Sequence, residues 1–225
     1  MQVLSPFLEC SIAITAKSDG PITTSAQIEA LLQRPVVLPS HEHSIHSYLG
    51  TSKTVPDEIS GDILITREKG LVLAHQFADC VPVLLVDRKK KGIVFAHAGW
   101  KGAVSGIIPI SLLHAQHENG SDKGDLWVWI GPSIHKQSYV LPMPPAQVVI
   151  PGWEDFIAET REGYQVDLPG FIRSQCLEFG IDDTRIIIDG RDTYLEADLF
   201  SHRKYLETQD VRENGNFAVG AWLTQ

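Results

Sequence analysis

The chain has 225 residues, 43% of them hydrophobic, and a formal net charge of -9 at pH 7. This length and apolar content suit one domain with a buried core and exclude a disordered chain. The negative charge argues against a broad face for nucleic acid, so we expect a small-molecule substrate and no nucleic-acid partner. No apolar run has the length of a membrane span and the first residues lack signal-peptide features, which predicts no membrane association and a cytoplasmic protein.

The three cysteines, Cys10, Cys80 and Cys176, lie far apart in the sequence. An odd number of widely spaced cysteines is a poor framework for disulfides and is typical of a reducing compartment. No exposed heptad pattern argues for assembly, so we expect a monomer.

The first half of the chain predicts one helix followed by a block of strands. Residues 23–35 contain two possible caps, apolar residues at helical spacing and a proline stop, which favours a short helix. Apolar, β-branched runs then predict strands at residues 36–49, 62–66, 71–77, 81–87 and 92–98. The basic segment 87–92 is interpreted as a solvated hairpin tip, with a basic binding patch as the alternative.

The second half changes to mixed helices and strands. Residues 101–120 predict a helix that Pro109 either kinks or delays. Further along we expect strands at residues 126–131, 185–189 and 216–223, and helices at residues 153–160 and 167–180. Because strands come in blocks with helices between them, we expect an α/β (α+β) fold with layered sheets in a single domain over residues 1–225.

Residues suited to difficult chemistry gather at three places: the histidines of residues 41–46, the pair Asp79 and Cys80, and His97 in a glycine-rich turn. Two neutral imidazoles and one thiolate form a ligand set that zinc accepts, and three protein ligands leave a fourth position for water or substrate. The spacing differs from that of a structural zinc finger, which needs four ligands in close pairs. The pattern therefore indicates a catalytic zinc site that the fold must assemble.

Structural interpretations compete with these assignments. Taken alone, Cys80 before an apolar strand is also typical of a small core residue, and His97 of a hydrogen-bonded core histidine. Asp79 is harder to explain this way, because a carboxylate beside a buried run costs free energy unless it is paired or used. His114 and His117 lie one helical turn apart, but a solvated helix face is favoured there over a metal site.

A multicopper oxidase is a further interpretation that the sequence tests. Such a site needs repeated His-x-His pairs and a cysteine flanked by histidines in one ligand loop. Only residues 41–43 have the His-x-His form, and Cys80 has no such flanking loop. The sequence therefore disfavours this interpretation.

Several motifs together resemble the YfiH family, which has also been labelled as laccase-domain or polyphenol oxidase proteins and as peptidoglycan editing factor. They are "GDILITREKGLVLAHQFADCVPVLLVD", "GIVFAHAGWKG", "GPSI" with "SY", and "DTY" with "LFSHRK". The resemblance runs from about His43 to the C-terminus, whereas about residues 1–35 are shortened or diverged. It implies a layered α/β/β/α sandwich similar to bacterial deamidating toxins, with one zinc held by His43, Cys80 and His97.

The chain departs from the family pattern at positions that bear on this site. His41 stands where the family usually has Gln, and on a strand it would share a face with His43, so His41 and nearby His46 stay alternative ligands. Four other positions usually carry cysteine or arginine in the family, and here they are Ser133, Gln137, His202 and Asn216. The missing arginines imply weaker phosphate binding.

The resemblance implies a zinc-dependent purine nucleoside enzyme. Its reactions would be phosphorolysis of adenosine, inosine, guanosine and methylthioadenosine, together with adenosine deamination. We expect catalytic roles for Cys80 and His97 at the metal, with Asp79 as acid and base. We expect Lys101 and Arg203 to hold the substrate phosphate.

Two other hypotheses stay open. The first is a metal-free hydrolase acting in peptidoglycan precursor editing, with Cys80 as nucleophile and His97 as base. The second is a protein that binds zinc but catalyses nothing. Alkylation by iodoacetamide distinguishes the zinc-dependent nucleoside enzyme from the metal-free hydrolase, because a thiolate bound to zinc is a poor free nucleophile.

Overall fold

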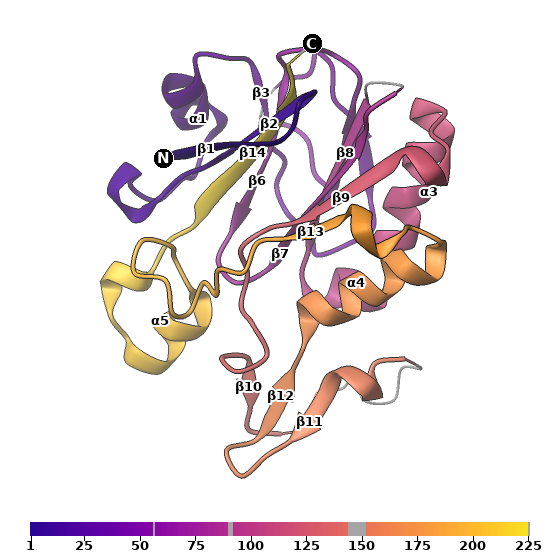
Figure 1. Ribbon diagram of the computed structural model, residues 1–225. Coiled ribbons are helices and arrows are strands. Elements are labelled where there is room, and N and C mark those ends of the chain that lie inside the picture. The colour runs from indigo at the N-terminus through magenta and orange to yellow at the C-terminus, as the bar shows by residue number, and fades with distance from the viewer. Residues whose placement is uncertain (56, 90–91, 144–151, 225) are drawn as a thin grey trace.

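The computed structural model describes residues 1–55, 57–89, 92–143 and 152–224. At its centre is a six-stranded sheet in the order β13-β9-β7-β8-β5-β4 (Figure 1). Its strands are β4 (Ser47–Leu49), β5 (Ile63–Thr66), β7 (Val81–Asp87), β8 (Gly92–Ala98), β9 (Leu126–Ile130) and β13 (Ile186–Ile188). Strand β7 pairs antiparallel with both β8 and β9.

A five-stranded sheet packs face to face against this one, in the order β1-β2-β14-β6-β3. Its strands are β1 (Gln2–Phe7), β2 (Cys10–Ile14), β3 (Val36–Val37), β6 (Val72–Phe77) and β14 (Phe217–Leu223). Leu84 of β7 belongs to the buried cluster between the sheets, together with Phe77 and Val219 of the five-stranded sheet. The interface between the sheets therefore forms the middle of the core.

Helices cover the outer faces of both sheets (Figure 1). Val83 of β7 packs on the opposite side from Leu84, with Leu112 of α3 (Ile107–Asn119) and Ile172 of α4 (Leu168–Phe179). Helix α1 (Ser25–Leu32) covers the other sheet. Burial on both faces explains why the central strands are almost continuously apolar, and the layers confirm the expected α/β/β/α arrangement.

The smaller elements gather at one end of the two large sheets (Figure 1). They are α2 (Trp100–Val104), α5 (His202–Thr208) and a three-stranded sheet of β10 (Val140–Leu141), β12 (Tyr164–Val166) and β11 (Ile157–Glu159). These elements surround the end of the core at which β7 begins and β8 ends.

Two sequence-based expectations for secondary structure are wrong. Residues 36–49 form no single strand, because β3 and β4 at its two ends join different sheets. Residues 153–160 form a 3-10 turn, Glu154–Phe156, and then β11, because pairing with β12 overrides their helix-like composition.

The expected helix at residues 101–120 is divided into α2 and α3 by Gly106, whose φ of 86° leaves the helical region. Pro109 lies in the first turn of α3, where a missing N–H is tolerated, and so it delays the helix as one alternative predicted. Helix α5 and strands β1 and β2 were not predicted.

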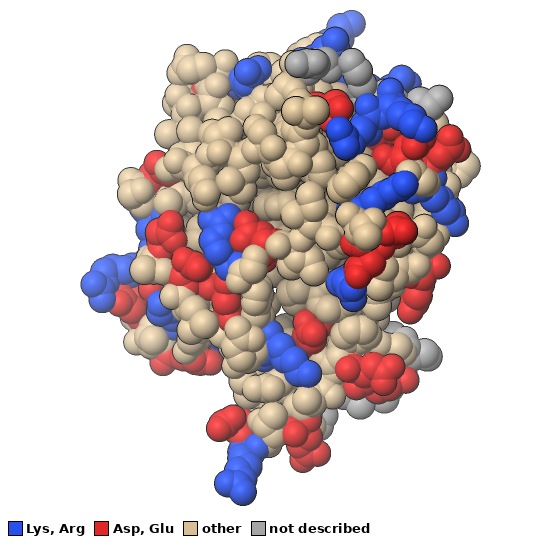
Figure 2. Space-filling view, in the orientation of Figure 1, with Lys and Arg blue, Asp and Glu red and all other residues tan. Residues whose placement is uncertain are grey.

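The structure also bears on the charge pattern. On the face shown in Figure 2, lysine and arginine side chains are interspersed with aspartate and glutamate. Antiparallel pairing of Asp87 with Gly92 confirms the hairpin between β7 and β8, whose residues 90 and 91 lie outside the described residues. Among the helices that the structure describes, none is both long and apolar enough to cross a membrane.

Candidate active site

The segment 78–80 carries the chain from β6 in the five-stranded sheet to β7 in the six-stranded sheet. Asp79 makes this turn with a φ of 88°, a region that residues other than glycine rarely adopt and that Asp tolerates better than most. Cys80 consequently lies at the edge of the interface between the sheets, directly before β7. A sharp turn between two layers thus brings the thiol to a cavity.

His43, Cys80 and His97 come together at this end of the core. Their ligand atoms all lie within 4.8 Å of one another, although the residues come from a loop before β4, the 78–80 turn and β8. A Cβ atom placed on Gly99 would lie 3.0 Å from Cys80 Sγ and 3.0 Å from His43 Cδ2. Glycine at that position keeps the space beside the three donors open, and two imidazoles with one thiolate fit zinc.

Asp62 orients His97 and the loop that carries His43. Its Oδ1 lies 2.9 Å from Nδ1 of His97, and its Oδ2 accepts hydrogen bonds from the Ser44 backbone N at 2.7 Å and the Ser44 hydroxyl at 3.0 Å. Burial opposes the charge of Asp62, but these hydrogen bonds outweigh it and hold its pKa well below the usual range. The contact at Nδ1 leaves Nε2 of His97 for a metal, an arrangement common among zinc sites.

The thiol of Cys80 differs from the other two. Burial opposes its ionisation, but the charge of His97 and hydrogen bonds from His43 and His97 lower its pKa to about 7. Burial lowers the pKa of His97, but Cys80 and Asp62 outweigh this effect and raise it to about 9. By contrast, burial raises the pKa of Cys10 and Cys176 to about 12. All three cysteines are free, and only the environment of Cys80 favours the thiolate form.

His41 and His46, the alternative ligands, have other partners. His75 Nε2 lies 3.2 Å from the Phe95 carbonyl, so it must donate, and its Nδ1 accepts from His41 Nε2 at 2.9 Å. Burial lowers the pKa of both His41 and His75, which favours their neutral forms. The His41 ring stacks on His97, with centroids 4.0 Å apart, while the exposed His46 pairs with Glu42.

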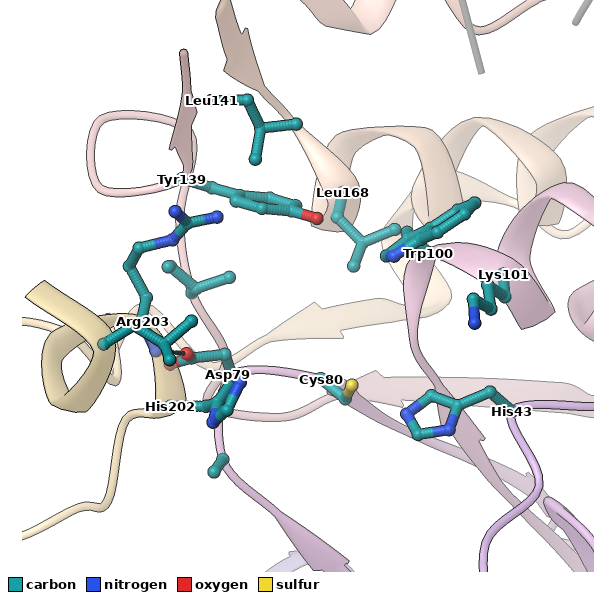
Figure 3. Close-up of a pocket in the computed structure, with 13 residues that line it drawn as sticks. His43, Asp79, Cys80, Trp100, Lys101, Tyr139, Leu141, Leu168, His202 and Arg203 are labelled. Atoms are coloured by element: carbon teal, nitrogen blue, oxygen red, sulfur yellow. Dashed lines mark hydrogen bonds between the residues drawn. The ribbon is translucent and has the colours of Figure 1, made fainter. Parts of the chain in front are cut away.

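A cavity of about 510 Å³ opens beside Cys80 (Figure 3). It is lined by His43, Ala78, Asp79, Cys80, Trp100, Lys101, Ile134, Tyr139, Leu141, Leu168, His202, Arg203 and Leu206. Arg203 and Asp79 lie on one side of Cys80, and His43 and Lys101 on the other. The Arg203 guanidinium lies 5.5 Å from the centroid of the Tyr139 ring. The cavity thus joins two cations to an apolar, aromatic wall.

Asp79 lines this cavity, and both of its carboxylate oxygens accept hydrogen bonds. Thr193 Oγ1 donates to Oδ1 at 2.7 Å, and the Arg203 backbone N donates to Oδ2 at 2.6 Å. Burial raises the pKa of Asp79, while the hydrogen bonds from Arg203, Thr193 and Ser201 oppose that shift. The acid and base role expected for Asp79 stays a prediction.

A second cavity of about 380 Å³ meets the first at His43, Ala78, Cys80 and His202. Its wall is more polar and includes His41, Gln76, Glu213 and Asn216. The site is therefore reached from two sides, one apolar with two cations and one polar. Neither His114 nor His117 belongs to the group of possible metal ligands found among the described residues.

Sequence reasoning missed Asp62, Trp100 and Tyr139 as site residues. Asp62 carried the same signal as Asp79, an acid at the start of an apolar strand. Tyr139 belongs to the "SY" motif of the resemblance, but that motif gave it no role, because its place on the cavity wall depends on the three-stranded sheet.

A family profile and curated proteins both match most of this chain. A family profile described as "Multi-copper polyphenol oxidoreductase laccase" matches residues 23–224. A protein of Bacteroides thetaiotaomicron named purine nucleoside phosphorylase is 32% identical over 200 residues, covering 82% of this chain and 74% of that one. Purine nucleoside phosphorylase YlmD of Bacillus subtilis is 34% identical over 148 residues, covering 64% of this chain and 53% of that protein.

Solved structures share the fold. A Bacillus licheniformis hypothetical protein named YfiH aligns with a TM-score of 0.80 and 21% identity, covering 95% of this chain and 92% of that one. YlmD of Geobacillus stearothermophilus aligns with a TM-score of 0.76 and 23% identity, covering 99% and 94%. At these identities the structures support the fold alone.

Proposed function

Since this chain belongs to the laccase-like YfiH family, whose relatives at about one-third identity are named purine nucleoside phosphorylase, we propose that it is a zinc-dependent purine nucleoside phosphorylase. The observation that carries the proposal is the convergence of His43, Cys80 and His97 beside a cavity that also holds Lys101 and Arg203. Zinc bound by the three residues would supply Lewis-acid chemistry at the floor of the cavity.

The cavity suits the two substrates of phosphorolysis. Phosphate would bind Arg203 and Lys101, since charge-assisted hydrogen bonds to phosphate are strong and geometrically specific. A purine would pack against the apolar and aromatic wall that includes Trp100, Tyr139 and Leu168. Phosphorolysis then forms a bond from a phosphate oxygen to C1′ of ribose and breaks the bond to the purine, which leaves with the electron pair and gains a proton.

We further propose adenosine deamination at the same site. Water and adenosine give inosine and ammonia in this reaction, so it needs no phosphate. His97 is held by Asp62 at Nδ1, which fixes how its ring faces His43 and Cys80. The two reactions therefore share the ligand residues and differ in their need for the cationic side chains.

Product analysis tests this proposal. Purified protein of known zinc content is incubated with adenosine, with and without phosphate, and the products are separated by chromatography. Phosphate-dependent adenine supports phosphorolysis, and inosine in either buffer supports deamination. We expect His97→Ala to lose zinc and both products, while His117→Ala on the exposed face of α3 keeps them. Intact adenosine with zinc-loaded wild-type protein would contradict the proposal.

A cysteine hydrolase for wall precursors is the second candidate, and one observation favours it. Cys80, His97 and Asp62 form a continuous chain of thiol, imidazole and carboxylate, and His97 lowers the pKa of the thiol. This enzyme would act without metal, and iodoacetamide would rapidly alkylate Cys80 in the resting protein. Slow alkylation of the zinc-loaded protein, with faster alkylation after chelation, would reject the hydrolase.

A further inference from the structure

Asp79 accepts hydrogen bonds from three other segments of the chain. Its carboxylate accepts from Thr193 Oγ1 at 2.7 Å and from the Arg203 backbone N at 2.6 Å. Its backbone carbonyl accepts from the Ile134 N at 3.0 Å. One residue in the turn between the two sheets therefore binds three segments that lie far apart in the sequence.

Two of these segments lead to a wall of the larger cavity. The segment after Ile134 carries Tyr139, and helix α5 begins beside Asp79 and carries Arg203 (Figure 3). Arg203 and Tyr139 meet across the cavity wall, with the guanidinium 5.5 Å from the ring centroid. Their relative positions thus depend on how α5 and the segment 134–139 are fixed to the turn.

The neighbouring segment 192–193 strengthens this link. Asp192 Oδ2 accepts a hydrogen bond from Ser138 Oγ at 2.7 Å, next to Tyr139. Thr193, the following residue, donates its hydroxyl to Asp79, and its backbone N donates to the Ser133 carbonyl at 3.0 Å. The two aspartates therefore both bind the segment that carries Tyr139, Asp79 at Ile134 and Asp192 at Ser138.

We propose that Asp79 is a positioning residue that fixes α5 and the segments around Ile134 and Thr193, so that Arg203 and Tyr139 are correctly placed for phosphate and purine. This inference rests on the proposed function and deepens it by separating positioning from proton transfer. Each carboxylate oxygen accepts a hydrogen bond from a different segment, Oδ1 from Thr193 and Oδ2 from the start of α5, and these are the contacts through which positioning would act.

Two substitutions at Asp79, to Asn and to Ala, distinguish the hydrogen bonds of the side chain from its negative charge. Asn tolerates the φ of 88°, accepts from the Arg203 N through its carbonyl, and donates to the Thr193 hydroxyl, which can reverse its role. Asp79→Asn therefore keeps the contacts and removes the carboxylate, whereas Asp79→Ala removes both. Thr193→Val removes one contact without changing a residue that lines the cavity. Thr66→Val is its control, because Thr66 is a buried threonine in β5 with a hydrogen bond to Gly50.

Steady-state phosphorolysis then separates the two roles. For positioning, we expect Asp79→Ala to raise KM for phosphate about tenfold, Thr193→Val about threefold, and Asp79→Asn less than about threefold, with kcat largely kept in Asn. Thr66→Val should keep the wild-type KM. A loss of about a hundredfold or more in kcat for both Asp79→Asn and Asp79→Ala, with KM unchanged, would overturn the proposal, since general acid and base groups contribute on that scale.

A readout independent of turnover keeps the inference testable if the proposed function fails. Hydrogen exchange of peptides covering α5 and residues 130–140 should be faster in Asp79→Ala and Thr193→Val than in wild type, and unchanged in Asp79→Asn. Unchanged exchange in all three variants would overturn the anchoring role. Absence of phosphate-dependent products from the zinc-loaded wild type would instead reject the proposed function.

Discussion

The two ends of the β7–β8 hairpin hold charge in different ways. At the turn end, Arg88 pairs with Glu9 at 3.0 Å and Lys89 with Asp125 at 2.7 Å, and the lysine side chain is 72% exposed. At the other end, His97 pairs with Asp62 at 2.9 Å, and these side chains are 3% and 0% exposed. The same two strands therefore end in two ion pairs with partly or mostly exposed basic side chains at one end and in a buried pair at the other.

This difference teaches where function should be sensitive to mutation. An exposed pair is screened by water and contributes little, so removing one partner changes little. Removal of a partner from a buried pair leaves a charge or polar group without compensation, which is costly. At the buried end His97 also contacts Cys80, so a change there reaches a potential metal ligand.

The largest effect should follow the loss of the thiol. We expect Cys80→Ala to lose bound zinc and to lower turnover of adenosine by about a thousandfold or more, because a two-ligand site holds zinc poorly. Zinc content after gel filtration and chromatographic assay of products measure both. The control is Cys10→Ala, a buried cysteine in β2 with a raised pKa, which should keep zinc and turnover. Full zinc content in Cys80→Ala would reject the site.

Removal of the Asp62 carboxylate should have an intermediate effect. We expect Asp62→Asn to weaken zinc affinity about 10- to 100-fold, because the carboxylate no longer orients His97 or raises the basicity of its ring. Competition with a chromophoric chelator measures the affinity. Asp125→Asn at the turn end is the matched control and should bind zinc as wild type does. Equal affinities in the two variants would show that the buried end has no special role.

Chelated protein should reveal the difference between the thiols as a pH profile. With the pKa of Cys80 lowered to about 7, its alkylation by iodoacetamide should rise about tenfold per pH unit below that value and level off above it. The sign follows from the thiolate, which is the reacting form and increases as pH rises through the pKa. Cys176, with a pKa raised to about 12, should stay unreactive over this range. A profile that still rises steeply above pH 8 would contradict the lowered pKa.

Local patterns were enough to predict most of the layered core. The runs that became β5 to β9 are apolar on both faces, and this burial is visible in the sequence. Strands β1 and β2 were not predicted, because β2 pairs with β14 from the far end of the chain and β1 pairs in turn with β2. Strand β11 was mistaken for a helix for a different reason, since the composition of residues 153–160 is helix-like and pairing with the nearby β12 overrides it.

The candidate site shows a similar division. Cys80 and His97 were identifiable from their neighbours, and a resemblance to a family added His43, which spacing alone left among three histidines. The structure brings these three together. Asp62 and Tyr139 stand within motifs that carry the resemblance, but their place at the site depends on contacts between distant segments and so follows from the arrangement of the layers.

The smallest effect is expected at the turn end of the hairpin. Lys89→Ala removes the ion pair with Asp125, but the lysine side chain is mostly exposed and its charge is screened by water. We expect no measurable change in Tm, zinc content or turnover, and thermal unfolding at low and high salt tests this. A clear loss of zinc or activity in this variant would mean that the two ends of β7 and β8 are coupled through the sheet, and the contrast between them would then fail.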